Sequence, residues 1–202
     1  MESTHKTRLA LAIALAMIAA GGCTDVSDLG RAKLIRHRVE LGATERFTWR
    51  PTDLAALESD IGQDQLVAES ASERGGQTVR QYLLVRVLFP VKPGRTSVDD
   101  SVINGQVTYI FETAEGEGGE VETLCYEGVG HVWVSKPWWL WGKKRFKIRH
   151  ALLELNRASV EDATDRFGHV EFTGDLTARV TPDAAEKVES LRQRILALQR
   201  LD

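Results

Sequence analysis

The sequence alternates most regularly between apolar and polar side chains in the stretch Phe167-Gly-His-Val-Glu-Phe-Thr-Gly-Asp-Leu-Thr-Ala-Arg-Val180. Apolar or small side chains occupy every second position from Val170 to Val180, and polar side chains lie between them from Glu171 to Arg179. Because successive side chains of a β-strand point to opposite faces, this pattern predicts an antiparallel strand with one face on a core and the other in water.

Several other segments have the composition or the alternation of strands. Residues 80–89 form a nearly continuous apolar run that Pro90 ends, which is typical of a strand buried on both faces. A glycine-rich connection at 114–119 joins two alternating segments and indicates a hairpin, because glycine readily adopts the positive φ of a tight turn. The further predicted strands are residues 106–113, 120–127, 129–135 and 144–155. Residues 33–41 alternate as a strand does, which is the favoured interpretation, but Leu34 and Ile35 could also begin a helix.

Two segments predict helices. Residues 51–61 begin with a proline, carry Asp53 where the helix dipole favours an anion, and end before a glycine, which predicts a short helix. Residues 181–201 begin with a threonine N-cap and a proline, and apolar residues then follow at steps of four and three. Packing of this second helix on the domain's own sheet is favoured over a partner helix. Residues 69–77 predict a polar loop.

These elements predict a mainly β domain, either an antiparallel β-sandwich or a curved sheet, with a short helix near its start and an amphipathic C-terminal helix. An α+β arrangement with a helix packed on one antiparallel sheet is the alternative. Residues 33–202 suit a single domain with one core. With 43% hydrophobic residues, 27% charged residues and a net charge of −3, the composition argues against a disordered chain and against nucleic-acid binding.

The chain begins with a charged segment that is followed by an apolar run at residues 9–20. Lys6 and Arg8 precede the run, which is the arrangement of a signal peptide. A helix of this length spans about 18 Å, well short of the ~30 Å hydrocarbon core of a bilayer. A permanent transmembrane anchor is therefore the less favoured alternative.

Directly after this run, Ala20-Gly-Gly-Cys23 resembles the lipobox of bacterial lipoproteins, although that family more often has leucine at the position of Ala20. The resemblance covers residues 1–23. It implies that residues 1–22 are a signal peptide, that Cys23 receives a diacylglyceryl group, and that residues 23–32 form a tether. Thr24, in place of Asp, implies the outer membrane by resemblance to sorting in enteric bacteria. Because two or more acyl chains attach a protein lastingly, we expect a lipid-anchored domain of the cell envelope, outside the cytoplasm.

Charged residues are segregated along the middle of the chain. Residues 96–127 include eight acidic side chains and no Lys or Arg, whereas residues 128–153 include six basic side chains and no acid. Because like charges that face each other across an antiparallel pair are destabilising, we expect the acidic hairpin to neighbour the basic strand that begins at Lys144. The alternative is that these charges simply pair with each other.

The basic segment contains Lys136-Pro-Trp-Trp-Leu-Trp-Gly-Lys-Lys-Arg145, which holds three of the five tryptophans. So many large apolar side chains in succession cannot share one face of a strand, and tryptophan prefers membrane interfaces and contact hot spots. We expect an interaction loop that dips into the bilayer or grips another envelope component. The alternative is that the tryptophans cover an open end of the sheet. The predicted contact residues are Trp138, Trp139, Trp141, Lys143, Lys144 and Arg145.

Catalytic and metal-binding motifs are sparse. The sequence has no Gly-x-Ser-x-Gly elbow, no His-Glu-x-x-His motif and no Cys-x-x-Cys pair. His131, His150 and His169 are spaced nineteen residues apart and could meet, with Cys125, as a metal site, but three unrelated histidines are favoured and no metal or cofactor is predicted. Cys125 lies in an alternating segment and is expected to be a small buried residue rather than a nucleophile.

The sequence therefore favours a non-catalytic binding or assembly module that is anchored to a membrane through Cys23 and presents the Trp/Lys-rich loop. Its expected partner is an envelope protein or an anionic surface, and not nucleic acid. Two alternatives stay open. An envelope enzyme or metal-binding protein with a histidine-centred site would bring the three histidines into one pocket, whereas a passive structural subunit would bury the tryptophan loop.

Overall fold

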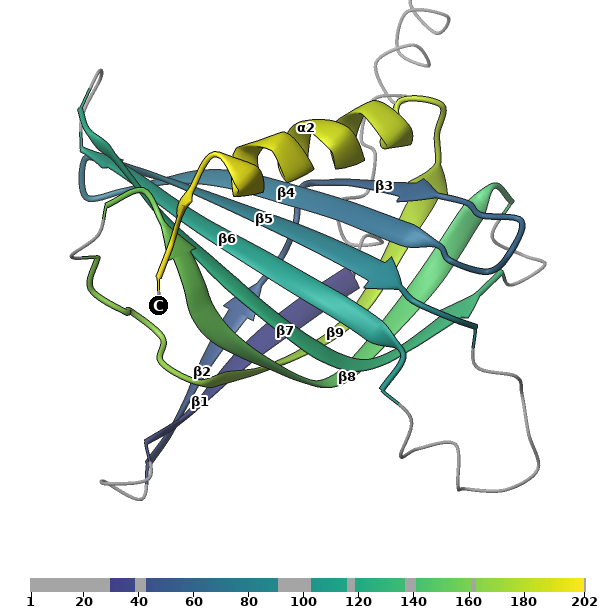
Figure 1. Ribbon diagram of the computed structural model, residues 1–202, viewed down its shortest axis with the longest axis horizontal. Coiled ribbons are helices and arrows are strands. Elements are labelled where there is room, and N and C mark those ends of the chain that lie inside the picture. The colour runs from purple at the N-terminus through teal and green to yellow at the C-terminus, as the bar shows by residue number, and fades with distance from the viewer. Residues whose placement is uncertain are drawn as a thin grey trace, which may run out of the picture.

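The computed structural model describes residues 30–38, 43–90, 103–115, 119–136, 141–160 and 163–201. In this part of the chain ten strands form one curved, mostly antiparallel sheet, and one helix packs on it (Figure 1). The prediction of a mainly β domain with a C-terminal helix is confirmed. The elements are β1 (Gly30–Arg38), β2 (Ala43–Trp49), β3 (Asp53–Leu57), β4 (Gln65–Arg74), β5 (Gln77–Val87), β6 (Gly105–Glu115), β7 (Val121–Ser135), β8 (Lys143–Ala158), β9 (Val170–Val180), α2 (Ala184–Leu196) and β10 (Gln199–Arg200).

The sheet closes on itself. β8 pairs with β7 at one edge and with β9 at the other, so the order of neighbours β8–β7–β6–β5–β4–β3–β9 returns to β8. The second edge of β9 is shared by two strands, because residues from Val170 to Leu176 pair with β1 whereas Arg179 and Val180 pair with β3, in parallel. The β1–β2 hairpin extends the sheet from this edge of β9, and its side chains Ala32, Leu34 and Trp49 belong to the main core.

The inner faces of the ring form the main core. The alternation that predicts β9 places Phe172 and Leu176 inside, where they are fully buried. Phe167 lies just before β9 and closes one end of the ring by packing edge-on against Tyr109 and Tyr126, at centroid distances of 6.2 and 5.3 Å. Such aromatic pairs contribute about 0.5–1.5 kcal/mol each beyond the burial of their area.

The helix α2 covers part of the outer face of the sheet, over β4 and β5 (Figure 1). Its apolar stripe of Val188, Leu191 and Ile195 packs on a second cluster of buried side chains, which comprises Val67, Leu84, Ile110 and Cys125. The predicted packing of this helix on the domain's own sheet is confirmed, with helix bounds that lie inside the predicted range 181–201.

Two local predictions are wrong. Residues 51–61 contain β3 instead of a helix. The three central side chains of this strand are all buried: Leu54 and Ala56 face the main core, and Ala55 lies on the other face, beneath α2. Because both faces are apolar, no alternation marks the segment as a strand. Residues 69–77 are not a loop, because β4 continues to its end before a two-residue turn at Gly75 and Gly76, whose φ angles are 57° and 81°. The strand β2 has no counterpart among the predicted strands.

Candidate functional site

The predicted interaction loop lies between β7 and β8, at what we call the Trp-loop end of the sheet. This is the end at which β5, β7 and β9 finish and β6 and β8 begin, and the arrowhead of β5 marks it in Figure 1. Trp138 and Trp139 fall outside the described residues. Trp141 is 89% exposed and precedes Gly142, whose φ is 65°. Trp141 therefore takes no part in covering the end of the sheet.

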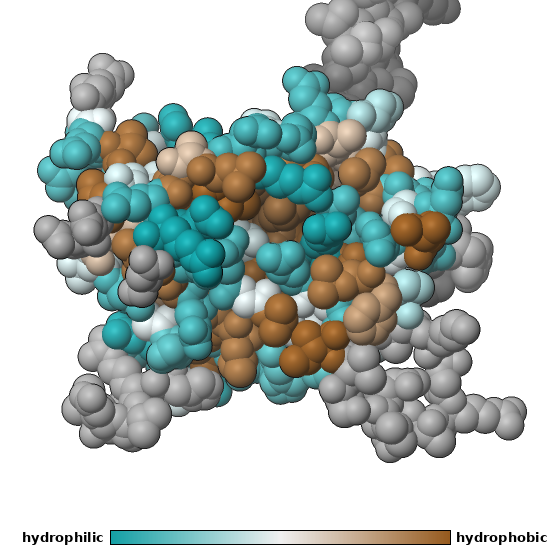
Figure 2. All heavy atoms as spheres, in the orientation of Figure 1, coloured by the Kyte–Doolittle hydropathy of each residue, from teal (hydrophilic) through white to brown (hydrophobic). Residues whose placement is uncertain are grey.

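Four more large apolar side chains are exposed at the Trp-loop end. Ile61 lies in the turn between β3 and β4, Leu88 and Phe89 follow β5, and Ile103 precedes β6. Their exposed fractions run from 36% for Leu88 to 69% for Ile61. We call these four residues and Trp141 the apolar rim. Brown hydrophobic atoms reach the surface in Figure 2 near the end of β5 and the start of β6.

Hydrogen bonds and one ion pair connect the segments that carry the rim. The buried side chain of Asn104 donates to the carbonyl oxygens of Phe89 (3.3 Å) and Val132 (2.8 Å), and its Oδ1 accepts the amide N–H of Val132 (2.8 Å). Lys136, at the base of the tryptophan loop, forms an ion pair with Glu58 (3.4 Å) in the turn between β3 and β4. The rim is therefore one surface held by the end of the sheet rather than a set of separate loops.

The three cations predicted to follow the tryptophans lie in different environments. Lys143 is partly exposed, and Arg145 is on the outer face, where it donates two hydrogen bonds to Asp175 (2.7 and 2.5 Å). These bonds hold the pKa of Asp175 below its usual range. Lys144 differs from the prediction, because it points into the ring and its ammonium lies 2.8 Å from both carboxylate oxygens of the buried Asp64. Lys144 is therefore a core ion pair and no surface contact.

The start of β1 determines where the chain enters the domain. Cys23 lies outside the described residues, seven residues before Gly30. Gly30 has a φ of 92°, and a Cβ there would lie 2.0 Å from the carbonyl oxygen of Asp175, so only glycine fits this entry point. Because β1 runs antiparallel to β9, the strand direction at Gly30, followed backward along the chain, points toward the Trp-loop end.

Strand spacing indicates which end of the sheet lies nearer to the start of β1. Leu176 pairs with both Gly30 and Phe146, so Gly30 is level with Phe146 along the sheet. Phe146 is three residues, about 10 Å along the strand, from the first residue of β8 at the Trp-loop end. The last residue of β8, Ala158, is twelve residues from Phe146, about 40 Å along the strand. Seven extended residues span at most about 25 Å. A group attached to Cys23 would therefore be within reach of the Trp-loop end and out of reach of the far end of β8.

The three histidines do not gather at one site. His169 lies beside Glu154 at 3.0 Å and is exposed. His131 and His150 line an open groove of about 650 Å³ on the outer face of β7 and β8, together with Trp133, Lys147 and Arg149. His150 occupies a bulge in β8 with a φ of 50° and lies 2.7 Å from Glu171. Among the described residues, no group of three or more His, Cys, Asp or Glu side chains could hold a metal ion.

The acidic hairpin neighbours β8, as predicted, but its carboxylates do not meet the basic start of that strand. The register pairs Glu127 with Glu154, whereas Arg145 is opposite Ser135. The acidic side chains form ion pairs with arginines from other parts of the chain. Glu112 pairs with Arg194 of α2 (2.8 Å), and Glu122 pairs with Arg166. Glu127 lies 4.0 Å from Arg157 of β8.

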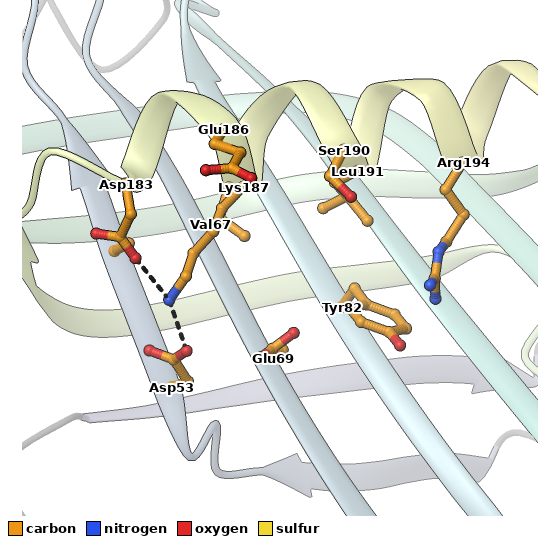
Figure 3. A pocket seen from close by; sticks show the side chains of 11 residues that line it. Asp53, Val67, Glu69, Tyr82, Asp183, Glu186, Lys187, Ser190, Leu191 and Arg194 are labelled. Atoms are coloured by element: carbon orange, nitrogen blue, oxygen red, sulfur yellow. Dashed lines mark hydrogen bonds and ion pairs between the residues drawn. The ribbon is translucent and has the colours of Figure 1, made fainter.

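A hollow of about 390 Å³ lies between α2 and the strands β3, β4 and β5 (Figure 3). Lys187 points from the helix into this hollow and forms ion pairs with Asp53 (2.7 Å) and Asp183 (3.3 Å). The hydrogen bond to Asp53 raises the pKa of Lys187, so the amine stays protonated and is no base or nucleophile. Arg194 lies 4.7 Å from the ring centre of Tyr82. These contacts fasten the helix to the sheet.

Cys125 lies under α2 and is completely buried, as predicted. Burial raises the pKa of its thiol to about 12, so the reactive thiolate is suppressed at neutral pH.

Comparison of the chain with models of protein families, with curated proteins and with solved structures finds no match. Within the described ranges, no helix combines the length and the apolar character needed to cross a bilayer.

The sequence reasoning missed most of the apolar rim. A signal was present, because Ile61 and Phe89 stand directly before the turn residues Gly62 and Pro90, where exposed polar residues are usual.

Proposed function

We propose that this protein is a lipid-anchored binding module of the cell envelope, without catalytic activity, that rests on its own membrane through the Trp-loop end. The observation that carries this proposal is the apolar rim, which lies at the end of the sheet where β1 begins, because β1 runs antiparallel to β9 from Gly30. Exposed apolar surface of this kind marks membrane or protein interaction sites. The lipobox-like segment that ends at Cys23 supplies the second membrane attachment.

The chemistry of the rim suits a bilayer interface. Trp141 is an amphipathic ring at an exposed turn, and Lys143, two residues later, and Lys136, at the end of β7, add positive charge at the same end of the sheet, where anionic headgroups would attract them. Full burial of one large apolar side chain contributes about 1.5–3 kcal/mol, so partial insertion of the rim adds several kcal/mol to the attachment by the lipid. The rim would thereby fix the orientation of a domain that the tether alone leaves free to rotate.

The anchor is tested by mass spectrometry of the protein from membranes of its native host. We expect an N-terminus at Cys23 that carries a diacylglyceryl group. An intact leader joined to an unmodified Cys23 would refute the anchor.

The orientation is tested with the lipidated protein in vesicles that contain doxyl-labelled lipids. We expect quenching of tryptophan fluorescence, with loss of most of it in a Trp138→Phe/Trp139→Phe/Trp141→Phe variant. Vesicle affinity of the protein produced without its lipid should fall in Ile61→Ala/Trp141→Ala and stay unchanged in Leu152→Ala/Val121→Ala. The control pair also removes exposed apolar side chains, because Leu152 and Val121 are 66% and 47% exposed and lie away from the rim. Equal losses in the two pairs would refute docking through the rim.

A further inference from the structure

A second hollow of about 230 Å³ lies on the outer face of the sheet, under the last turns of α2. Figure 2 shows a strongly hydrophilic patch beside the C-terminal end of the helix. Three arginines from three elements line this hollow: Arg86 of β5, Arg157 of β8 and Arg192 of α2. We call it the arginine pocket. These three residues are far apart in the sequence and form no motif. The sheet register and the packing of α2 bring them together.

Among the described residues, carboxylates compensate the positive charge of the arginine pocket only in part. Glu127 is the only carboxylate that lines it, and its oxygen is 4.0 Å from Nε of Arg157, the limit of an ion pair. Arg192 donates a hydrogen bond to the amide oxygen of Gln65 (2.8 Å) and lies 3.8 Å from Glu189. Arg86 makes no ion pair within the described ranges. Three guanidinium groups thus share one poorly placed carboxylate inside the pocket.

One donor in the pocket is both buried and unused. The Nε atom of Arg157 is excluded from solvent and has no hydrogen-bond partner among the described residues. Buried N–H groups nearly always have a partner, and where the protein supplies none, a bound ion, ligand or water molecule often takes that place. An anion in the hollow would lie among the three guanidinium groups that line it and would neutralise part of their charge.

We propose that the arginine pocket binds a phosphate ester. Guanidinium groups present donors in a fixed fork that matches the oxygens of phosphate, and three of them can surround a dianion. The apolar side chains of Leu84 and Ile195 form part of the wall, which suits an organic group attached to the phosphate rather than a bare ion. The C-terminal dipole of α2 opposes an anion here, but its half charge is small beside three full positive charges.

The arginine pocket adjoins the apolar rim along β5, because Arg86 is two residues before Leu88, but none of its lining residues belongs to the rim. It therefore extends the proposed function without depending on it. The phosphate ester could come from a lipid headgroup or from a small metabolite. We would measure binding of inorganic phosphate, glycerol 3-phosphate and phosphatidic acid in mixed micelles to the full chain, by calorimetry and by thermal shift. Sodium chloride at equal ionic strength controls for screening of charge.

The variants are Arg86→Gln and Arg157→Gln, with Arg80→Gln as the matched control. Arg80 and Arg86 are exposed side chains on the same face of β5, so the control removes the same charge outside the pocket. Each pocket variant removes a charged hydrogen-bond donor to the phosphate, which weakens the binding free energy. We therefore expect Kd to rise about tenfold or more in Arg86→Gln and Arg157→Gln and to stay unchanged in Arg80→Gln. Arg86→Gln keeps the test decisive if Arg157→Gln fails to fold.

Binding of any of the three probes with this pattern of losses supports the site. A response to phosphatidic acid alone would assign the ligand to a lipid headgroup, and a response to glycerol 3-phosphate alone to a small metabolite. The proposal is overturned if no probe binds above the sodium chloride control, or if Arg80→Gln weakens binding as much as Arg86→Gln does.

Discussion

Replacement of Lys144 by methionine should destabilise the fold far more than loss of a surface charge. The ammonium of Lys144 lies 2.8 Å from both oxygens of Asp64 and 3.0 Å from Glu58, and the side chains of Lys144 and Asp64 are only 7% and 8% exposed. The methionine would fill the space of the lysine stem but leave the Asp64 carboxylate buried beside a single N–H donor from Ser59 (2.9 Å).

Removal of one partner of a buried ion pair costs about 3–5 kcal/mol, because the remaining charge has lost its compensation. For a domain of this size, this corresponds to a fall in Tm of roughly 6–20 °C. The matched control is Arg145→Met. Arg145 is the next residue of the same strand, and this change breaks its exposed ion pair with Asp175 of β9. Exposed pairs contribute about 0–1 kcal/mol, so this variant should stay close to the wild-type Tm.

The assay is urea unfolding followed by circular dichroism, with the double variant Lys144→Met/Asp64→Leu as the third measurement. Replacement of both charges by apolar groups removes the uncompensated carboxylate, so the double variant should recover most of the lost free energy of unfolding. The reasoning fails if Lys144→Met and Arg145→Met cost the same. It also fails if the double variant is less stable than Lys144→Met alone.

Three further outcomes follow from the core and from one surface pair. Because burial raises the pKa of Cys125 to about 12, iodoacetamide should modify it at pH 8 only in urea; modification of the folded protein at the rate of a free thiol would contradict this. Phe167→Ala should cost about 3–5 kcal/mol by calorimetry, because it empties the aromatic end of the ring, and a loss below about 1 kcal/mol would show that the end is closed by other groups. The Arg145 guanidinium lowers the pKa of Asp175 in the folded state, so this carboxylate stabilises the fold above its unfolded pKa and loses that effect as the pH falls through the folded pKa. Asp175→Asn should therefore flatten the loss of stability below about pH 4, and an unchanged acid profile would exclude this contribution.

The strands that carry alternating side chains can be predicted because the period of two is local information. The segment that forms β9 is the clearest case. The closure of the ring cannot be predicted, because it depends on pairing of β9 with both β8 and β3, and no residue pattern records which distant edges meet. The segment around Ala55 gives a wrong prediction for a related reason: a short strand with two apolar faces has the same composition as a helix turn.

The candidate site can be predicted in part. Trp141 is exposed, which fits one of the two alternatives for the loop. Lys144 does not belong with the surface cations, and the alternation of β8 itself argues against that grouping. Lys144 shares its face with Phe146 and Ile148, whereas Arg145 and Lys147 share the other face. An inward lysine needs a buried partner, and Asp64 lies eighty residues earlier in the chain, so only the fold could identify it.

The register of β7 and β8 explains why the charges of this domain are separated in space as they are in sequence. A short connection joins the end of β7 to the start of β8, so the residues nearest the loop must pair with each other, as Ser135 does with Arg145. The acidic start of β7 is therefore held at the opposite end of the hairpin, where Glu122 pairs with Arg166. In the proposed orientation the Lys136 and Lys143 cations face the lipid surface, whereas carboxylates at the start of β7, such as Glu122, are kept some tens of ångströms away. Under this proposal, a hairpin with the two charge blocks exchanged is expected to bind anionic vesicles more weakly than the natural order does.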